Sequence, residues 1–167
     1  MENFADLLAS NKEYASAFKS MGLSGEAIKG LAIVTCMDSR IDPLHIVGMD
    51  AGDAKILRNA GARVTDDVLR TLVLATYLLG VKRVLVMPHT DCRMAKNNEA
   101  EIHAMIDKQH GVDTRSIEFR TVDDQQSALI SDVTRIRTFP LLPKGLVVVG
   151  AIYDVATGLL NAVDCNA

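Results

Sequence analysis

Residues 30–40 read GLAIVTCMDSR, and this stretch decides the fold. Its apolar, β-branched run predicts a buried strand from about Leu31 to Thr35, because strands covered on both faces are almost continuously apolar. The strand delivers Cys36, Asp38 and Arg40, three side chains that can carry chemistry. Open α/β sheets place their functional groups at the carboxyl ends of strands, so we expect a site here.

Other segments supply the rest of the sheet. Three further strands are predicted from apolar runs at residues 54–57, 83–87 and 145–152. The tail at 153–164 has turn residues between apolar pairs and is expected to form a terminal hairpin or edge strand. Helices are predicted over about 43–47, 66–79, 97–109 and 123–137. This alternation predicts an α/β fold with a mostly parallel central sheet of four strands and a C-terminal edge strand, flanked by helices.

The composition predicts one globular domain over residues 1–167. Apolar residues make up 49 % of the chain and charged residues 23 %, which is typical of a protein with a packed core. Apolar residues between Phe4 and Phe18 have near-helical spacing and predict an N-terminal helical arm whose apolar face needs a partner. No apolar stretch could span a bilayer and no signal-peptide pattern opens the chain, so we expect a cytoplasmic protein without a membrane partner.

Charge and cysteine content narrow the kind of site. A net charge of −3 gives no electrostatic footprint for nucleic acid, so we expect no such partner. Three cysteines, an odd number, favour metal binding, catalysis or plain burial over a disulfide framework. Cys165 has no ligand-type neighbour except Asp164, and we interpret it as incidental.

Cys36 and the later motif His89-Thr90-Asp91-Cys92 together supply two thiolates and one imidazole. Each motif follows a predicted strand, so a parallel sheet would bring both to one end. These ligands suit zinc, and they leave a fourth tetrahedral position open, as catalytic zinc sites do. We therefore expect one zinc ion per chain. The alternative is a pair of ordinary buried cysteines.

Asp38 and Arg40 are two residues apart just after the first strand. An extended backbone would point both side chains to the same side, where a bidentate carboxylate–guanidinium pair would form. Such a pair would hold Asp38 ionised, ready to orient the water beside the zinc or to accept its proton. Freed from Arg40, the carboxylate would instead close the fourth zinc position. An ordinary salt bridge at a strand end is the alternative.

The chain resembles the β-class carbonic anhydrases, in particular their compact prokaryotic branch. The resemblance rests on three motifs in order, which are Cys-x-Asp-x-Arg at 36–40, Arg-Asn-Ala-Gly at 58–61 and His-x-x-Cys at 89–92. It implies that the backbone around Ala60 and Gly61 borders the substrate pocket. It also implies a homodimer or homotetramer in which the N-terminal helix reaches across to the neighbouring chain.

The resemblance assigns roles to the residues singled out above. It implies that Cys36, His89 and Cys92 bind zinc and that Asp38 and Arg40 form a catalytic dyad beside the ion. In some members the matching aspartate ligates zinc in a closed state, so Asp38 is also expected as a metal ligand. The implied activity is that of a zinc lyase, the reversible hydration of CO2 to bicarbonate and a proton.

Two alternatives remain open at this point. The first is a carbonyl sulfide or carbon disulfide hydrolase on the same scaffold, because these linear molecules are similar to CO2. The second is a non-catalytic zinc or redox-sensing protein, in which Asp38 keeps the metal closed and the thiolates respond to oxidation. An intact Asp38 and Arg40 pair favours an enzyme, because a purely structural site needs no such pair.

Two residues depart from the family pattern, in which glycine commonly precedes the histidine and follows the second cysteine. Pro88 stands before His89, where it removes a backbone donor and stiffens the approach to the histidine. Arg93 follows Cys92. We expect Arg93 to pair with Asp91 or another acid such as Asp50 or Glu99, or else to alter the pocket mouth.

Overall fold

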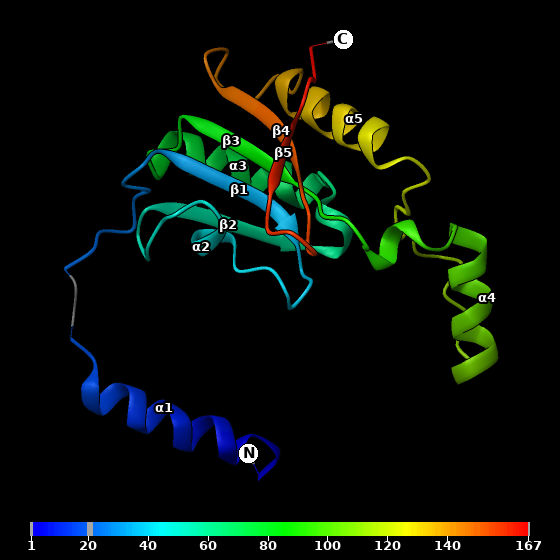
Figure 1. Cartoon of the computed structure of the whole chain (residues 1–167), viewed down its shortest axis with the longest axis horizontal. Coiled ribbons are helices and arrows are strands. Elements are labelled where there is room, and N and C mark those ends of the chain that lie inside the picture. Colours follow the sequence, from blue (N-terminus) through cyan, green and yellow to red (C-terminus); the bar gives the residue numbers. More distant parts are fainter. Residues whose placement is uncertain (1, 20–21, 167) are drawn as a thin grey trace.

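The computed structural model describes residues 2–19 and 22–166. Within them, five strands form one sheet in the order β2-β1-β3-β4-β5 (Figure 1). The strands are β1 Leu31–Cys36, β2 Ala54–Asn59, β3 Arg83–Met87, β4 Val147–Tyr153 and β5 Leu160–Val163. Strands β1 to β4 are parallel to one another, whereas β5 runs antiparallel to β4 at the edge. The predicted α/β fold and its C-terminal edge strand are confirmed.

Five α-helices accompany the sheet in the described residues. They are α1 Ala5–Ala17, α2 Pro43–Ile46, α3 Asp66–Leu78, α4 Glu99–His110 and α5 Gln125–Arg137. Short 3₁₀ turns lie at η1 Glu2–Phe4, η2 Ala60–Ala62 and η3 Arg93–Ala95. Helices α2 to α5 begin after polar caps whose side chains accept a first-turn N–H, namely Asp42, Thr65, Asn98 and Asp124. The predicted helices are confirmed, with ends displaced by two residues at most.

Two strand boundaries differ from the prediction by two residues, and the others by one residue at most. Strand β4 begins at Val147 rather than at residue 145, because the N–H of Leu146 donates to the Pro143 carbonyl at 3.0 Å and closes a turn. Strand β2 continues to Asn59, which is paired with Cys36 of β1. The longer β2 supports the full length of the strand that carries the first cysteine.

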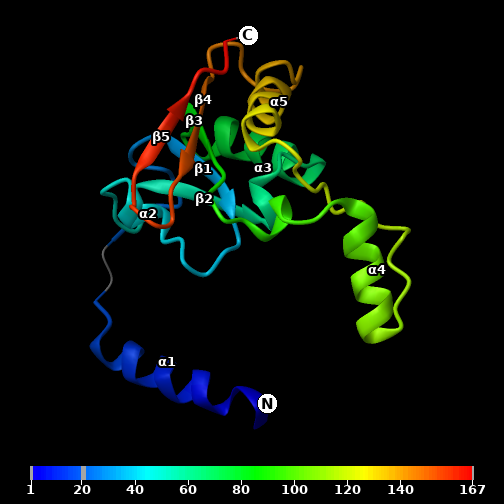
Figure 2. The same ribbon diagram turned by 45° about the vertical axis from the view of Figure 1, so that its right-hand side comes forward.

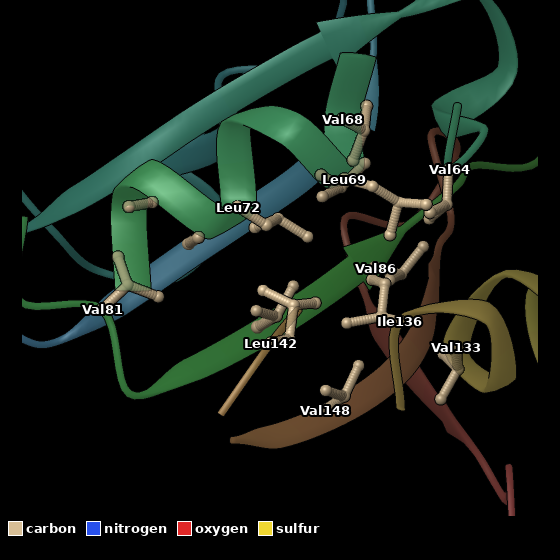
Figure 3. Packing of buried hydrophobic residues seen from close by; sticks show 14 of the residues in the cluster. Val64, Val68, Leu69, Leu72, Val81, Val86, Val133, Ile136, Leu142 and Val148 are labelled. Atoms are coloured by element: carbon tan, nitrogen blue, oxygen red, sulfur yellow. The ribbon is translucent and has the colours of Figure 1, made fainter. Parts of the chain in front are cut away.

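Alternate residues of the central strands face opposite sides of the sheet, as the pleat requires. One side packs under α3 and α5 in a buried cluster that includes Val64, Val68, Leu69, Leu72, Val86, Val133, Ile136 and Val148 (Figure 3). The other side carries a second cluster, in which Ile33, Leu85 and Met87 join Cys36 and Cys92. Both cysteines therefore belong to the core and not to the surface.

Helices α1 and α4 lie away from the sheet in both views (Figures 1 and 2), and neither contains a buried residue. The predicted N-terminal helix is confirmed. Large apolar side chains on and beside it are exposed, namely Phe4, Leu7, Leu8, Tyr14 and Phe18. None of the helices in residues 2–19 and 22–166 combines the length and apolar character needed to cross a bilayer.

A buried ion pair fixes the chain just after η2. Arg63 Nε donates to Asp132 Oδ2 of α5 at 2.7 Å, and the backbone N–H of Val64 donates to Asp132 Oδ1 at 3.2 Å. Asp132 is only 5 % exposed. Its carboxylate therefore has to be compensated by these donors.

Replacement of Asp132 by alanine is expected to lower the free energy of unfolding by about 3 kcal/mol, because the half-buried Arg63 guanidinium and the buried Val64 N–H both lose their acceptor. Urea unfolding of the metal-loaded protein measures the loss. Asp67→Ala is the control, since Asp67 pairs with Arg70 on the exposed surface of α3. We expect its loss to be several times smaller. Equal losses for the two variants would contradict this role of the ion pair.

Candidate metal centre

Two neighbouring strands carry the site. Strands β1 and β3 are parallel and in register, with Thr35 opposite Met87, and the Thr35 hydroxyl donates to the Met87 carbonyl at 2.7 Å. Cys36 is the last residue of β1, and His89 lies two residues beyond the end of β3. Both side chains consequently lie at the carboxyl edge of the sheet, the location expected from the sequence.

Three ligand-type side chains meet there. The ligand atoms of Cys36, His89 and Cys92 all lie within 4.8 Å of one another. The two sulfur atoms are 3.9 Å apart. Two sulfurs bound to one tetrahedral zinc, each at about 2.3 Å, are separated by about 3.8 Å. The geometry and the donor set therefore fit a zinc ion.

The hydrogen bonds around His89 suit a metal ligand. Its side chain is fully buried, and Nδ1 donates to the Thr90 carbonyl at 2.8 Å. This bond leaves a bare lone pair on Nε2, which is buried without a hydrogen-bond partner among the described residues. Gln125 Nε2 donates to the His89 carbonyl at 2.6 Å. An orphaned imidazole nitrogen facing two sulfurs is what a bound metal would satisfy.

Strand β4 anchors the backbone on both sides of His89. Tyr153 donates its N–H to the Pro88 carbonyl, and Thr90 donates its N–H to the Tyr153 carbonyl, each at 2.9 Å. Pro88 takes part in this pairing only through its carbonyl oxygen. The N–H that proline lacks is therefore not needed here.

The two thiols influence each other's acidity. A hydrogen bond from Cys92 lowers the pKa of Cys36 well below that of an ordinary thiol, against the opposing effect of burial. The same contact, together with burial, raises the pKa of Cys92. Without a metal, the pair thus shares one proton between two sulfurs; zinc, which binds thiolates, would replace it.

The turn at Gly61 allows the backbone to approach the first cysteine. The Gly61 N–H donates to Cys36 Sγ at 3.4 Å. Gly61 has φ +77°, and a Cβ there would lie 3.2 Å from the Met94 side chain. A larger residue would therefore strain the backbone and crowd the site.

Asp38 and Arg40 form the bidentate pair that the sequence predicts. Arg40 Nε donates to Asp38 Oδ1 at 2.9 Å, and Nη2 donates to Oδ2 at 2.8 Å. The expected extended backbone is wrong, because the chain turns here and the Arg40 N–H also donates to Asp38 Oδ1 at 2.9 Å. Hydrogen bonds from Arg40 hold the pKa of Asp38 well below its usual range. Asp38 Oδ2 lies 3.7 Å from His89 Nε2.

Arg58 holds the loop that carries these residues, a role that the sequence did not indicate. Its guanidinium donates to three backbone carbonyls, those of Cys36 at 2.9 Å, Asp38 at 2.6 Å and Ile41 at 3.2 Å. Since β2 pairs with β1, the position of Arg58 beside the loop follows from strand register. Only the pairing of the strands could have revealed it.

Asp91 and Lys96 extend the charged network. Arg40 Nη1 donates to Asp91 Oδ2 at 2.9 Å, and Lys96 Nζ lies 2.6 Å from Asp91 Oδ1. The expected pairing of Arg93 with Asp91 is wrong, because Arg40 and Lys96 occupy that carboxylate. Arg93 instead donates to the sulfur of Met105 on α4 at 3.8 Å.

An open cavity of about 590 Å³ joins these side chains. Cys36, Asp38, Arg40 and Cys92 line it, together with Met37, Ser39, Ala60, Asp91, Arg93, Met94 and Lys96. Of the expected pocket residues, Ala60 lines this cavity, whereas Gly61 lines a small neighbouring one beside Cys92. Cys165 lies outside the cluster, and its thiol donates to the Val163 carbonyl.

The fold and the site define a class of protein: a mostly parallel α/β sheet whose carboxyl edge carries two cysteines and one histidine that could hold a metal ion. Residues 31–160 match the family model described as carbonic anhydrase. A β-carbonic anhydrase 1 from Mycobacterium tuberculosis is 38 % identical over 159 residues, which cover 95 % of this chain and 96 % of that protein.

Further similarities agree with this match. A crystal structure of carbonic anhydrase from Streptococcus mutans has a TM-score of 0.91 and 36 % identity, over 98 % of this chain and 99 % of that one. A carbon disulfide hydrolase from Acidithiobacillus thiooxidans is 27 % identical in an alignment that covers 84 % of this chain and 76 % of that protein. This chain belongs to the β-carbonic anhydrase family, and it is a lyase of the carbonic anhydrase type.

Proposed function

We propose that this protein catalyses the zinc-dependent, reversible hydration of CO2 to bicarbonate and a proton. The observation that carries the proposal is the meeting of three ligand atoms within 4.8 Å beside a carboxylate held by arginine. Cys36, His89 and Cys92 would hold the ion. A zinc ion there would supply a water molecule acidic enough to lose its proton near neutral pH.

Asp38 is the group that would act on this nucleophile. Its Oδ2 lies 3.7 Å from His89 Nε2, next to the position of the ion. Because Arg40 keeps the carboxylate ionised, Asp38 can accept a hydrogen bond from the nucleophile and orient it toward CO2. Arg40 therefore works through Asp38 as a positioning residue.

The same pair would control access to the metal. Arg40 engages both oxygens of Asp38 in this structure, which keeps the carboxylate turned to the guanidinium. Without those donors, the nearby carboxylate would be free to become the fourth metal ligand and exclude water. We propose that Asp38 has both roles, in two states of the site.

Carbon disulfide or carbonyl sulfide hydrolysis is the second candidate, favoured by the similarity to a carbon disulfide hydrolase. The higher identity to a β-carbonic anhydrase favours CO2. The cavity also carries three cationic side chains, Arg40, Arg93 and Lys96, and such a lining suits an anionic product such as bicarbonate.

Stopped-flow CO2 hydration on zinc-quantified protein at pH 7 and 8.5 tests the proposal, with carbonyl sulfide and carbon disulfide hydrolysis measured in parallel. We expect fast hydration that is stronger at pH 8.5 and absent in Cys36→Ala. Sulfide release with little CO2 hydration would transfer the assignment to the hydrolase. Inactivity toward all three substrates with one zinc per chain would favour a sensing site.

We also propose that the protein is a homo-oligomer, a dimer or a tetramer. Support comes from α1, whose apolar side chains are exposed in a single chain although burial would stabilise them. Light scattering measures the assembly, and the 18.1 kDa mass of one chain at micromolar concentration would contradict it.

The reduced thiols of the centre suit the cytoplasm, the location that we propose.

A further inference from the structure

The charged side chains that line the metal-site cavity do not balance. Asp38 and Asp91 contribute two carboxylates, whereas Arg40, Arg93 and Lys96 contribute three cations. A zinc ion with two thiolate ligands, a neutral imidazole and a neutral water molecule would add no net charge to this set. One positive charge in the lining is therefore left without a counter-charge.

Arg93 is the cation without a carboxylate partner. Arg40 takes both oxygens of Asp38 and one of Asp91, and Lys96 takes the other oxygen of Asp91. In residues 2–19 and 22–166, no carboxylate forms an ion pair with Arg93. The one hydrogen bond that its side chain makes among these residues is the donation to Met105 Sδ at 3.8 Å.

That contact leaves most of the guanidinium available. A thioether is a weak hydrogen-bond acceptor, and arginine has five N–H donors in a planar fork. Arg93 follows Cys92 directly and lines the same cavity as both sulfur ligands. An unpaired fork beside a metal centre matches a planar oxyanion, which accepts two parallel hydrogen bonds, better than a spherical ion.

We propose that Arg93 forms a binding site for a small planar oxyanion, bicarbonate, at the cavity beside the metal centre. The identity of the anion rests on the proposed function, since bicarbonate is the product of CO2 hydration. The site would retain the anion near the centre before release and capture it in the reverse reaction. Arg93 would thus recognise bicarbonate, the charged product of the reaction. It would not strengthen the binding of neutral CO2.

Bicarbonate titration of the zinc-loaded, ¹⁵N-labelled protein at constant pH and ionic strength tests the site. We expect the Arg93 Nε–H resonance to shift saturably with bicarbonate but not with chloride. Backbone amides of Met37 and Ala60 report occupancy of the cavity in every variant. Arg93→Gln should weaken bicarbonate binding about tenfold, the scale of a charge-assisted hydrogen-bonded contact, and Arg93→Lys should fall between wild type and Arg93→Gln.

Lys144→Gln is the matched control for loss of one positive charge. Lys144 is exposed and precedes β4, at the opposite edge of the parallel sheet from the metal centre. We expect it to bind bicarbonate as wild type does. Affinity of Arg93→Gln within twofold of wild type, an equal loss in Lys144→Gln, or an equal shift with chloride would overturn the proposal.

The CO2 hydration rate of the same wild-type sample separates the two proposals. Normal hydration together with unaltered bicarbonate binding in Arg93→Gln would refute the Arg93 site and leave the proposed function standing. Arg93-dependent bicarbonate binding in a protein that does not hydrate CO2 would support the Arg93 site and refute the proposed function.

Discussion

Alanine at position 36 is expected to leave less than about a tenth of the chains loaded with zinc after dialysis. Binding of zinc to a protein site at pH 7 is worth about 10–16 kcal/mol. Shared among Cys36, His89 and Cys92, this is roughly 4 kcal/mol per ligand, so the loss of one thiolate lowers the affinity about 10³-fold. CO2 hydration should fall with the metal content, and metal analysis with stopped-flow assay measures both.

Cys165→Ala is the matched control, because Cys165 is as buried as Cys36 but lies outside the ligand cluster. It should keep one zinc per chain. A cysteine behaves as a small apolar residue in a core, so both variants should remain folded, which circular dichroism verifies. Full zinc content in Cys36→Ala would remove the basis for the metal assignment.

Replacement of Arg40 by glutamine is expected to lower the CO2 hydration rate about 100-fold while the zinc content stays near one per chain. The variant loses the donors that hold Asp38 away from the metal. The pKa of Asp38 would rise toward the ordinary carboxyl range, which leaves the group ionised at pH 8.5, so protonation does not explain the loss. Absorption bands of the cobalt-substituted variant should change as Asp38 enters the metal's ligand sphere.

The chain contains its own control for this experiment. Asp113 and Arg115 repeat the Asp-x-Arg geometry, with Nε and Nη2 of the arginine donating to the two carboxylate oxygens at 2.9 and 2.7 Å. This second pair lies beside α4, outside the metal-site cavity. Arg115→Gln should retain both rate and cobalt spectrum. A CO2 hydration rate for Arg40→Gln within threefold of wild type would rule out the proposed role of Arg40 in holding Asp38.

The sequence predicts the location of the metal centre because the relevant signals are local. A β-branched run ends in Cys36, a second run ends just before His89, and parallel neighbours expose their carboxyl ends at one edge. The Asp38 and Arg40 pair was predictable for a similar reason, since a spacing of two residues lets one side chain reach the other. The turn that makes the contact was not predicted.

Contacts between distant segments could not be predicted in the same way. Arg58 reaches the loop at 36–41 through the register of β2 on β1, and Arg63 meets Asp132 across 69 positions of sequence. The choice of Arg40 over Arg93 as partner of Asp91 depends on a turn in which Asp91 has φ +55°. Aspartate adopts a positive φ more often than most residues other than glycine, but the sequence does not show which aspartate will do so.

The hydrogen bond from Thr35 to Met87 has a consequence for how the protein reaches its active form. It joins residues 52 positions apart, so the contact between β1 and β3 is non-local and the loop between them must close first. A slip of one residue between these strands would displace Cys36 from His89 by about 3.3 Å and turn its side chain to the opposite face. Only the correctly aligned pair can then bind zinc, so the ion would stabilise correctly folded chains selectively over misaligned ones.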